Sequence, residues 1–408
     1  MQLVAYGAQD IYLTGNPQIT FFKVVYRRHT NFAMESIEQT FSGSVELGRR
    51  VTATISRNGD LIKDMWLECT FGTVTNAVYG LGNALVKQVE VEIGGQLIDR
   101  QYGEWLDVWS ELSTPEGKRV GYDAMVGNTS TGLTVTPTPN ANIDVPLMFW
   151  FNRNPGLALP LIALQYHEVK INLDLETGLN LATGAGKVAT TLSSMKFWVD
   201  YIYLDTDERR RFAQVSHEYL IEQLQFTGDE TLAAATKRVD LSFNHPVKEL
   251  IWVAQTTGQA RGSADNATQP CQFSSIGFTS AKLQLNGQDR FQERRPEYFV
   301  NVQTYKHHTH MPRANRTLAL RVNVDDENTP ANAYWRAPVE NVSQYIYVYS
   351  FALNPEEHQP SGTCNFSRID NATLVLTGGS VTGILKVYAV NYNVLRIMSG
   401  MGGLAYSN

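Results

Sequence analysis

From residue 36 onward, apolar and polar side chains alternate along much of the chain. A period of two places one face of a segment on a core and the other face in water, which predicts β-strands. The alternation is clearest at 44–47, 51–55 and 86–93. Further strands are predicted at 61–68, 147–151, 169–175 and 197–204. Asn58-Gly59-Asp60 and Gly94-Gly95-Gln96 separate strands and predict turns, since glycine accepts the positive φ that tight turns need.

One stretch has the helical period instead. Trp105, Val108, Trp109 and Leu112 recur at i, i+3, i+4 and i+7, which predicts a short helix that ends before Pro115. We expect its tryptophans to pack in a core rather than to stack on a ligand. Residues 113–143 are rich in Thr, Gly, Pro and Asn and are predicted to form a loop, as are the polar stretches 254–270 and 303–340.

The pattern also repeats. Residues 37–43 recur with one extra residue as 221–228. Three further matches follow in the same order, and their offset only grows: Asn58 to Trp66 with Asn244 to Trp252, 94–96 with 286–288, and Pro160 to Tyr166 with Pro360 to Phe366. Collinear matches with a growing offset indicate a duplicated unit with small insertions in the second copy. Each copy is long enough to bury its own core.

Many short strands with few helices predict an all-β protein. The size of each copy favours two tandem eight-stranded antiparallel jelly rolls, with an N-terminal arm and few short helices. The expected boundaries are an arm at 1–33, a first jelly roll at 34–206, a linker at 207–216, a second jelly roll at 217–396 and a tail at 397–408. The linker overlaps the charge run 205–211 and is expected to be solvated.

The arm has no counterpart before the second copy, so it does not belong to the repeated unit. It is apolar around Phe21 and Phe22 and carries the basic run Arg27, Arg28 and His29. We expect it to dock on a neighbour or on an underlying layer. The glycine-containing, apolar tail is expected to be flexible and to contact a neighbour. The aromatic run 345–349 suits a core strand better than an interface.

Charge and cysteine content narrow the possible functions of the chain. Its 408 residues carry a net charge of −6, which argues against a broad electrostatic grip on nucleic acid. Three dispersed cysteines suit a reducing compartment. The N-terminus lacks a signal-peptide pattern, and the longest apolar runs fall short of the roughly 20 residues that span a bilayer. We therefore expect a soluble protein made in a cytoplasm.

Motifs of enzymes and metal sites are incomplete in this sequence. The pairs at His167 and His217 do not complete a zinc-protease motif, and 184–187 is half a phosphate-binding loop. The histidines of 307–310 and the carboxylates of 325–327 could ligate a metal, but a polar surface loop is the better interpretation. No catalytic residue, cofactor or metal is therefore predicted.

Six Asn-x-Ser/Thr sequons occur, about as many as chance gives in a chain rich in Ser and Thr. Asn128, Asn266 and Asn315 lie in predicted loops and could carry glycans. Asn365 and Asn371 lie in a predicted strand region and are not expected to. Without a signal peptide, secretory glycosylation is not expected.

Long runs of the sequence carry a family resemblance. The start of the chain, with Tyr6-Gly7-Ala8-Gln9-Asp10, is similar to the start of the major capsid proteins of large icosahedral double-stranded DNA viruses, most closely those of algae. The resemblance continues through residues 55–61, 155–169, 284–291, 360–374 and 391–406. It weakens mainly in the loops predicted above.

The resemblance implies two jelly rolls standing side by side. Three chains would form a pseudo-hexagonal capsomer that tiles the outer shell of a virion, above minor capsid proteins and an internal membrane that the chain does not span. The arm would lie at the capsomer base. No direct contact with nucleic acid is implied, and synthesis would take place in the host cytoplasm.

Two other functions are alternatives to a capsid protein. A jelly-roll lectin would bind glycans through its loops, but it would need neither the arm nor the tail. An enzyme of the cupin type would need a His-x-His and a carboxylate on facing strands. His308 and His310 make the only His-x-His in the chain, and they lie in a predicted loop.

Overall fold

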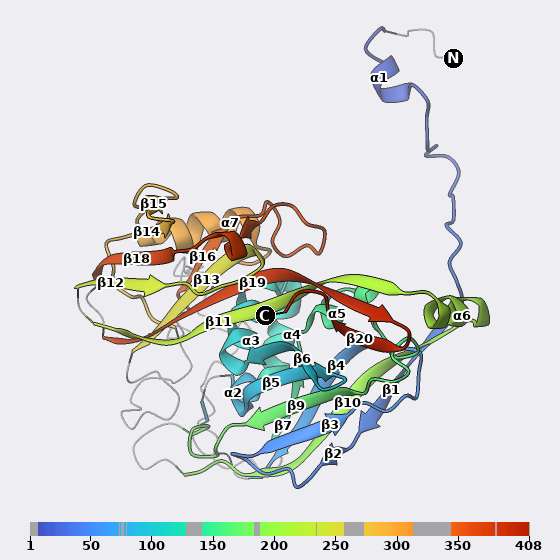
Figure 1. Ribbon diagram of the computed structural model, residues 1–408, viewed down its shortest axis with the longest axis horizontal. Helices are drawn as coiled ribbons and strands as arrows, with labels where there is room; N and C mark the ends of the chain where they lie inside the picture. The colour runs from blue at the N-terminus through green and yellow to red at the C-terminus, as the bar shows by residue number, and fades with distance from the viewer. Residues whose placement is uncertain are drawn as a thin grey trace, which may run out of the picture.

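The computed structural model describes residues 7–407 except 73, 75–76, 79, 128–140, 183–187, 234, 257–272, 313–343 and 380–381. The described strands form four sheets, two from each half of the chain, and every pairing between named strands is antiparallel. In each half the two sheets share one apolar core, so the halves are two β-sandwiches joined through a central layer of short helices (Figure 1). This is the double jelly roll that the sequence predicts.

The first jelly roll consists of sheets with the orders β1-β10-β4-β7 and β2-β3-β9-β5-β6, and β8 pairs with β4. Its strands are β1 (Phe32–Gln39), β2 (Phe41–Ser42), β3 (Arg50–Thr54), β4 (Leu61–Phe71), β5 (Val86–Ile93), β6 (Gln96–Tyr102), β7 (Ala141–Pro146), β8 (Leu159–Pro160), β9 (Val169–Leu175) and β10 (Leu192–Leu204). We call the sheet that contains β4 and β10 the first outer sheet.

The second jelly roll has the orders β11-β19-β13-β16 and β12-β18-β14-β15, with β17 on β13 and β20 on β19. Its strands are β11 (His217–Leu232), β12 (Ala235–Asp240), β13 (Pro246–Thr256), β14 (Ser280–Leu285), β15 (Gln288–Asp289), β16 (Ile346–Ser350), β17 (Cys364–Asn365), β18 (Ala372–Gly379), β19 (Gly383–Met398) and β20 (Met401–Leu404). We call the sheet that contains β13 and β19 the second outer sheet.

Nine strands of one half match nine of the other in order and pairing, the short β8 and β17 included, as a duplication requires. The strand pairing corrects the sequence matches in detail. Ile62 pairs with β8 as Val247 pairs with β17, so β4 and β13 correspond at an offset of 185, not 186. Because side chains alternate between faces, this one-residue shift places Trp66 on the outer face and Trp252 in the core.

Most of the predicted strands are confirmed. Inward side chains of β4, β5 and β9 alternate with more exposed ones and fill the first core. Two strand predictions are wrong. Residues 44–47 precede a turn at Gly48 and form no strand, and 147–151 follows β7 and enters α5 (Trp150–Arg153). The second error arises because an apolar run is buried whatever its backbone geometry, and here Phe149 and Phe151 stack within the core.

Helices fill the connections. The predicted helix is confirmed as α3 (Gly103–Ser113), but residues 116–126 are not a loop. Pro115 caps α4 (Glu116–Val126), which ends at Gly127 in the left-handed conformation that glycine favours. The charged linker forms α6 (Thr206–Gln214), whose N-cap Asp205 accepts a hydrogen bond from the Thr206 amide. The other helical segments are α1 (Ile11–Thr14), α2 (Leu81–Leu85), α7 (Gln303–His307), the π-helix η2 (Tyr298–Val302), and the 3-10 turns η1 (Pro155–Leu157) and η4 (Phe366–Arg368).

The two ends of the chain behave differently. The arm projects away from the sandwiches beside α6 (Figure 1), and Tyr12, Phe21 and Phe22 are each at least 90% exposed. The tail was expected to be flexible, but it folds back as β20 along β19 and contacts the first jelly roll of the same chain. The Gly402 backbone lies against Leu164, and its carbonyl lies 2.9 Å from Nδ1 of His167. A Cβ at residue 402 would clash with Leu164.

Candidate assembly surfaces

Helix α3 is the main contact between the two jelly rolls. Leu106 faces the core of the first jelly roll, whereas Trp105, Trp109 and Leu112 face the second outer sheet. The sheet meets them with six buried apolar side chains: Ile251, Val253, Ile346, Val348, Tyr388 and Val390. The Trp105 ring lies 5.3 Å from the Tyr388 ring. The tryptophans therefore pack in a core as predicted, but this core lies between the jelly rolls.

The rim of this contact is charged. Lys386 on β19 forms an ion pair with Glu104 at the start of α3, and its Nζ lies 3.2 Å from Asp229. The Glu104 and Lys386 side chains are about one-tenth exposed. A charge pair this well shielded from water is screened little by salt, so it fixes the register of α3 on the sheet. The sequence contains no local signal for it, because its partners are 282 residues apart.

A second ion-pair group joins the jelly rolls beside α5. Arg153 of α5 donates to Glu222 of β11 at 2.9 Å, and Lys248 of β13 lies 2.6 Å from the same carboxylate. The Arg153 guanidinium also lies 4.1 Å from the Trp109 ring centre. Burial disfavours the Glu222 carboxylate, but Lys248 and Arg153 outweigh this and hold its pKa at about 2. Glu222 is therefore an anion at neutral pH.

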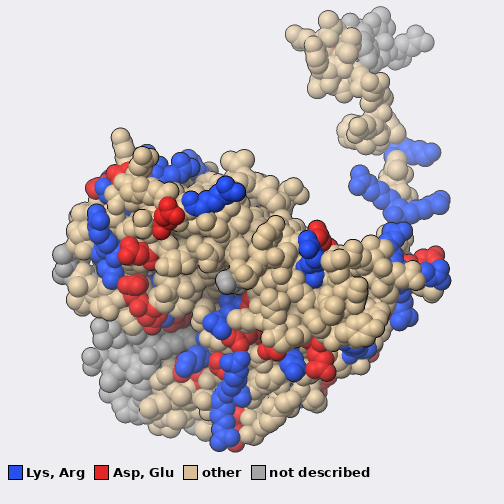
Figure 2. Space-filling model, viewed as in Figure 1, with Lys and Arg blue, Asp and Glu red and all other residues tan. Residues whose placement is uncertain are grey.

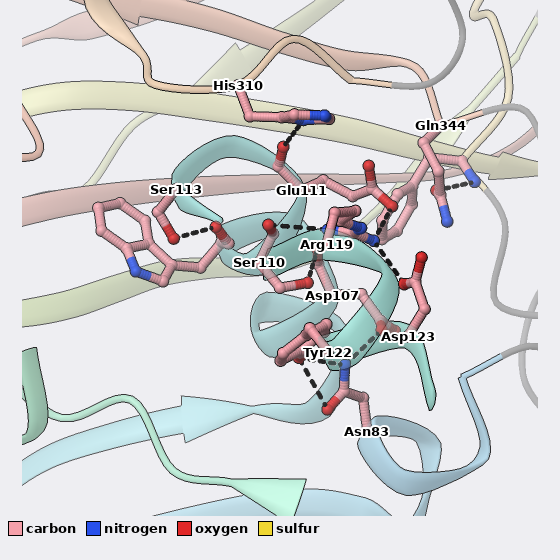
Figure 3. A network of polar contacts seen from close by, with 12 residues as sticks. Asn83, Asp107, Ser110, Glu111, Ser113, Arg119, Tyr122, Asp123, His310 and Gln344 are labelled. Atoms are coloured by element: carbon pink, nitrogen blue, oxygen red, sulfur yellow. Dashed lines mark hydrogen bonds and ion pairs between the residues drawn. The ribbon is translucent and has the colours of Figure 1, made fainter. Parts of the chain in front are cut away.

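A buried polar network holds α4 against α3 (Figure 3). Arg119 of α4 donates to the Ser110 carbonyl at 2.8 Å and forms ion pairs with Glu111 and Asp123. Asn83 donates to Asp107 at 2.7 Å and to the Tyr122 hydroxyl at 3.0 Å. The network explains why a segment with a polar sequence forms a packed helix. Its signal in the sequence is the proline before Glu116 and the glycine after Val126.

The histidine run at 307–310 is partly buried: the side chains of His308 and His310 are buried, whereas His307 is half-buried and Thr309 is exposed. His310 of the second jelly roll lies against the end of α3, where its Nδ1 donates to the Glu111 carbonyl at 2.7 Å (Figure 3). Its Nε2 faces Glu116 at 3.2 Å. His310 thus links the two jelly rolls.

His308 lies between two carboxylates. Its Nε2 is 3.0 Å from Glu249 of β13, and its Nδ1 is 2.8 Å from Glu356. Both nitrogens face acceptors, so the arrangement favours the doubly protonated imidazolium. Burial opposes this charge, but Glu249 and Glu356 prevail and raise the pKa of His308 to about 9. In the described part of the chain no group of three or more possible ligands could hold a metal ion.

This pKa predicts a pH dependence of stability. The folded pKa of His308 lies above its unfolded value of about 6.5, so its contribution is fully present below pH 6.5 and is lost as pH rises through 9. We expect the free energy of unfolding to fall across this window by at most about 1.4 kcal/mol per pH unit. Urea unfolding at pH 6 to 9.5 measures it.

The His308→Gln variant should flatten this profile. His29→Gln in the exposed arm is the matched control and should keep the slope. Equal slopes for His308→Gln and the unaltered protein would show that another group titrates.

Other candidate residues have different outcomes. Asn128, Asn266 and Asn315 lie outside the described residues, as do 184–187 and 325–327, so glycosylation stays a prediction. Asn365 lies in β17 and Asn371 just before β18. In the 345–349 run, Ile346, Tyr347 and Val348 are fully buried, which confirms a core strand. No helix in the described ranges is long and apolar enough to cross a membrane.

These features define a class of protein: two jelly rolls fused through a buried helix, with an arm extended into solvent. Solved structures place this class among viral coat proteins. A structure of the PBCV-1 virus capsid matches 95% of this chain and 100% of its own, with a TM-score of 0.75 at 41% identity. The Faustovirus major capsid protein shares the fold at 13% identity, with a TM-score of 0.71 over 96% of this chain.

Sequence relatives give the family. The family described as "Major capsid protein N-terminus" matches residues 20–205, and "Large eukaryotic DNA virus major capsid protein" matches 208–319 and 328–403. The major capsid protein of Pyramimonas orientalis virus is 57% identical over 100% of this chain and 99% of its own. That of Paramecium bursaria Chlorella virus 1 is 44% identical over the same shares.

The chain therefore belongs to the major capsid proteins of large eukaryotic DNA viruses. It is a structural protein of the virion capsid, not an enzyme. The family resemblance that the sequence carries is confirmed.

Proposed function

We propose that this protein works as a homotrimer, a capsomer with six similar sides that tiles the outer icosahedral shell. The observation that carries the proposal is the duplication itself. Two jelly rolls with the same strand order stand in one chain, so three chains arranged around an axis present six comparable units. Each chain provides two of the six sides, one from each jelly roll. The two kinds of side alternate around the ring, so contacts at alternate corners can differ.

The arm supports a role at the base of the capsomer. Its apolar residues are exposed, and large exposed apolar segments mark sites of interaction. Lys23, Arg27 and Arg28 add positive charge along the same arm (Figure 2). We assign this segment to contacts with minor capsid proteins beneath the shell, above an internal membrane that the chain does not enter. The protein is synthesised in the host cytoplasm in this proposal.

The mass of the purified protein in solution tests the trimer. We expect multi-angle light scattering to give three times the chain mass of 45.6 kDa. Negative-stain images of the same fraction should show particles with a hexagonal outline. A monomer at every concentration and ionic strength, without such particles, would contradict the proposal.

A further inference from the structure

The duplication leaves two equivalent surfaces in unequal states. In the second jelly roll, the face of the outer sheet is covered by α3 of the first jelly roll. The equivalent face of the first outer sheet has no such cover from the described residues, and Trp66 and Trp198 are stacked on it with ring centres 6.4 Å apart. Two half-exposed tryptophans on an open sheet face are typical of an interface.

Strand registers identify which residues of the two faces correspond. Trp66 pairs with Trp198 and Pro146, and Ile251 pairs in the same way with Tyr388 and Val348. Trp198 therefore takes the place of Tyr388, on which Trp105 packs. Two residues further along, at the next position on the same face, Lys196 takes the place of Lys386, the partner of Glu104.

The covering helix also has a duplicate. The β5–β6 hairpin precedes α3, and it corresponds to the β14–β15 hairpin at an offset of 192 residues. Leu106 and Phe299 each enter the core of their own jelly roll, and they correspond at an offset of 193. With this offset of 193 residues, η2 and α7 take the place of α3. The positions that contact the second outer sheet in α3, namely Trp105, Trp109 and Leu112, become Tyr298, Val302 and Tyr305.

The exposure of these residues fits an unoccupied contact face. Tyr298 is half-buried, Val302 is 39% exposed and Tyr305 is 78% exposed, whereas Phe299, Gln303 and Thr304 on the opposite side are buried. A hollow of about 340 Å³ opens beside them, lined by residues from Glu293 to Val302. Figure 1 shows α7 on the side of the second jelly roll that is remote from the first.

We propose that η2 and α7 of one chain cover the first outer sheet of a second copy, as α3 covers the second outer sheet within a chain. This rests on the proposed trimer and assigns the contact that closes it. Two intrachain pairs then have interchain equivalents of the same chemistry. The Trp105–Tyr388 ring contact becomes Tyr298 with Trp198, and the Glu104–Lys386 ion pair becomes Glu297 with Lys196.

Charge on the two faces agrees with this pairing. Where the second outer sheet has Val253 and Ile346, the first has Glu68 and Asp144. Arg294 and Arg295, next to η2, are exposed and would face these acids. Lys196 lies 3.8 Å from Glu68 with its side chain 46% exposed, so it is free to take a closer partner. The face within the chain is apolar, and the face between chains is more polar, as suits a surface that is in water before assembly.

A charge exchange tests the proposal. Glu297→Lys and Lys196→Glu should each place like charges at all three contacts and raise the concentration at which trimers dissociate by about tenfold or more. The double variant restores opposite charges and should return that concentration to near its original value. Arg49→Glu, on an exposed turn of the first jelly roll, is the control and should change nothing. Analytical ultracentrifugation over a concentration series gives the readout, and circular dichroism shows that each variant is folded.

The outcomes separate the two proposals. Single variants that stay trimeric at every concentration would overturn this contact and leave the trimer standing. Failure of the double variant to recover would also overturn it. An unaltered protein that never forms trimers would instead refute the proposed function. A second readout is positive: p-benzoylphenylalanine in place of Tyr305 should cross-link to β4 or β10 of another chain, and cross-links elsewhere would contradict the assignment.

Discussion

Trp105→Ala is expected to lower the free energy of unfolding by about 3–5 kcal/mol, the usual cost of truncating a fully buried tryptophan. The side chain is 0% exposed and lies between the Trp109 ring, 5.7 Å away, and the Tyr388 ring. The surrounding sheet is too rigid to close over the space, so the variant loses packing contacts as well as apolar burial.

The position of Trp105 predicts a second effect of the same substitution. Since the residue lies between the jelly rolls and not inside one, its loss should uncouple them. We expect urea unfolding of the variant, followed by far-UV circular dichroism, to separate into two transitions. Val120→Ala, at a 69% exposed position on α4, should change the free energy of unfolding by less than about 0.5 kcal/mol. A loss below about 1 kcal/mol for Trp105→Ala would show that α3 does not hold the halves together.

Glu222→Gln should lower the free energy of unfolding by a comparable amount, for a different reason. It leaves Lys248, whose side chain is 0% exposed, without its counter-ion, and breaking one side of a buried pair costs about 3–5 kcal/mol. Glu218→Gln on the same strand is the matched control. Its partner Arg396 is half-exposed and the pair is worth about 0–1 kcal/mol.

Two further measurements test the cause. The double variant Glu222→Gln with Lys248→Met removes both charges and should be more stable than Glu222→Gln alone, because no buried lysine is left unpaired. The folded pKa of Glu222, about 2, lies below its unfolded value of about 4.5. Its contribution is therefore present above pH 4.5 and is lost as pH falls toward 2. A double variant less stable than the single one would show that Lys248 is stabilised by other groups.

How far the sequence predicts this structure depends on the distance over which each feature is encoded. Alternation along β5 and β9 and the helical spacing around Trp109 are local, and they predict the elements correctly. The duplicated order of motifs predicts two similar folds because each copy repeats its turns. The contacts between Glu222, Lys248 and Arg153 join three separate elements, and no local pattern marks them.

The errors have physical causes too. Helix α4 was missed because its stability comes from Arg119 and its buried partners, not from an apolar stripe. The polar sequence of 307–310 predicts a surface loop because polar residues usually are exposed, whereas the side chains of His308 and His310 are buried against carboxylates and a carbonyl group. The match between Trp66 and Trp252 is off by one residue because the turn from Asn244 to β13 is one residue shorter than the turn from Asn58 to β4, which composition alone cannot reveal.

The permanent cover that α3 provides changes the kinetics of ring formation. In the proposed trimer, a ring of six similar units, half of the lateral contacts form as each chain folds, in a first-order step that does not depend on concentration. Two encounters between molecules then close the three remaining contacts. The rate of ring nucleation then scales with at most the third power of protein concentration, whereas six separate jelly rolls would face a sixth-power law. Covalent linkage would thus let the proposed capsomer form at lower protein concentrations than six separate jelly rolls would need.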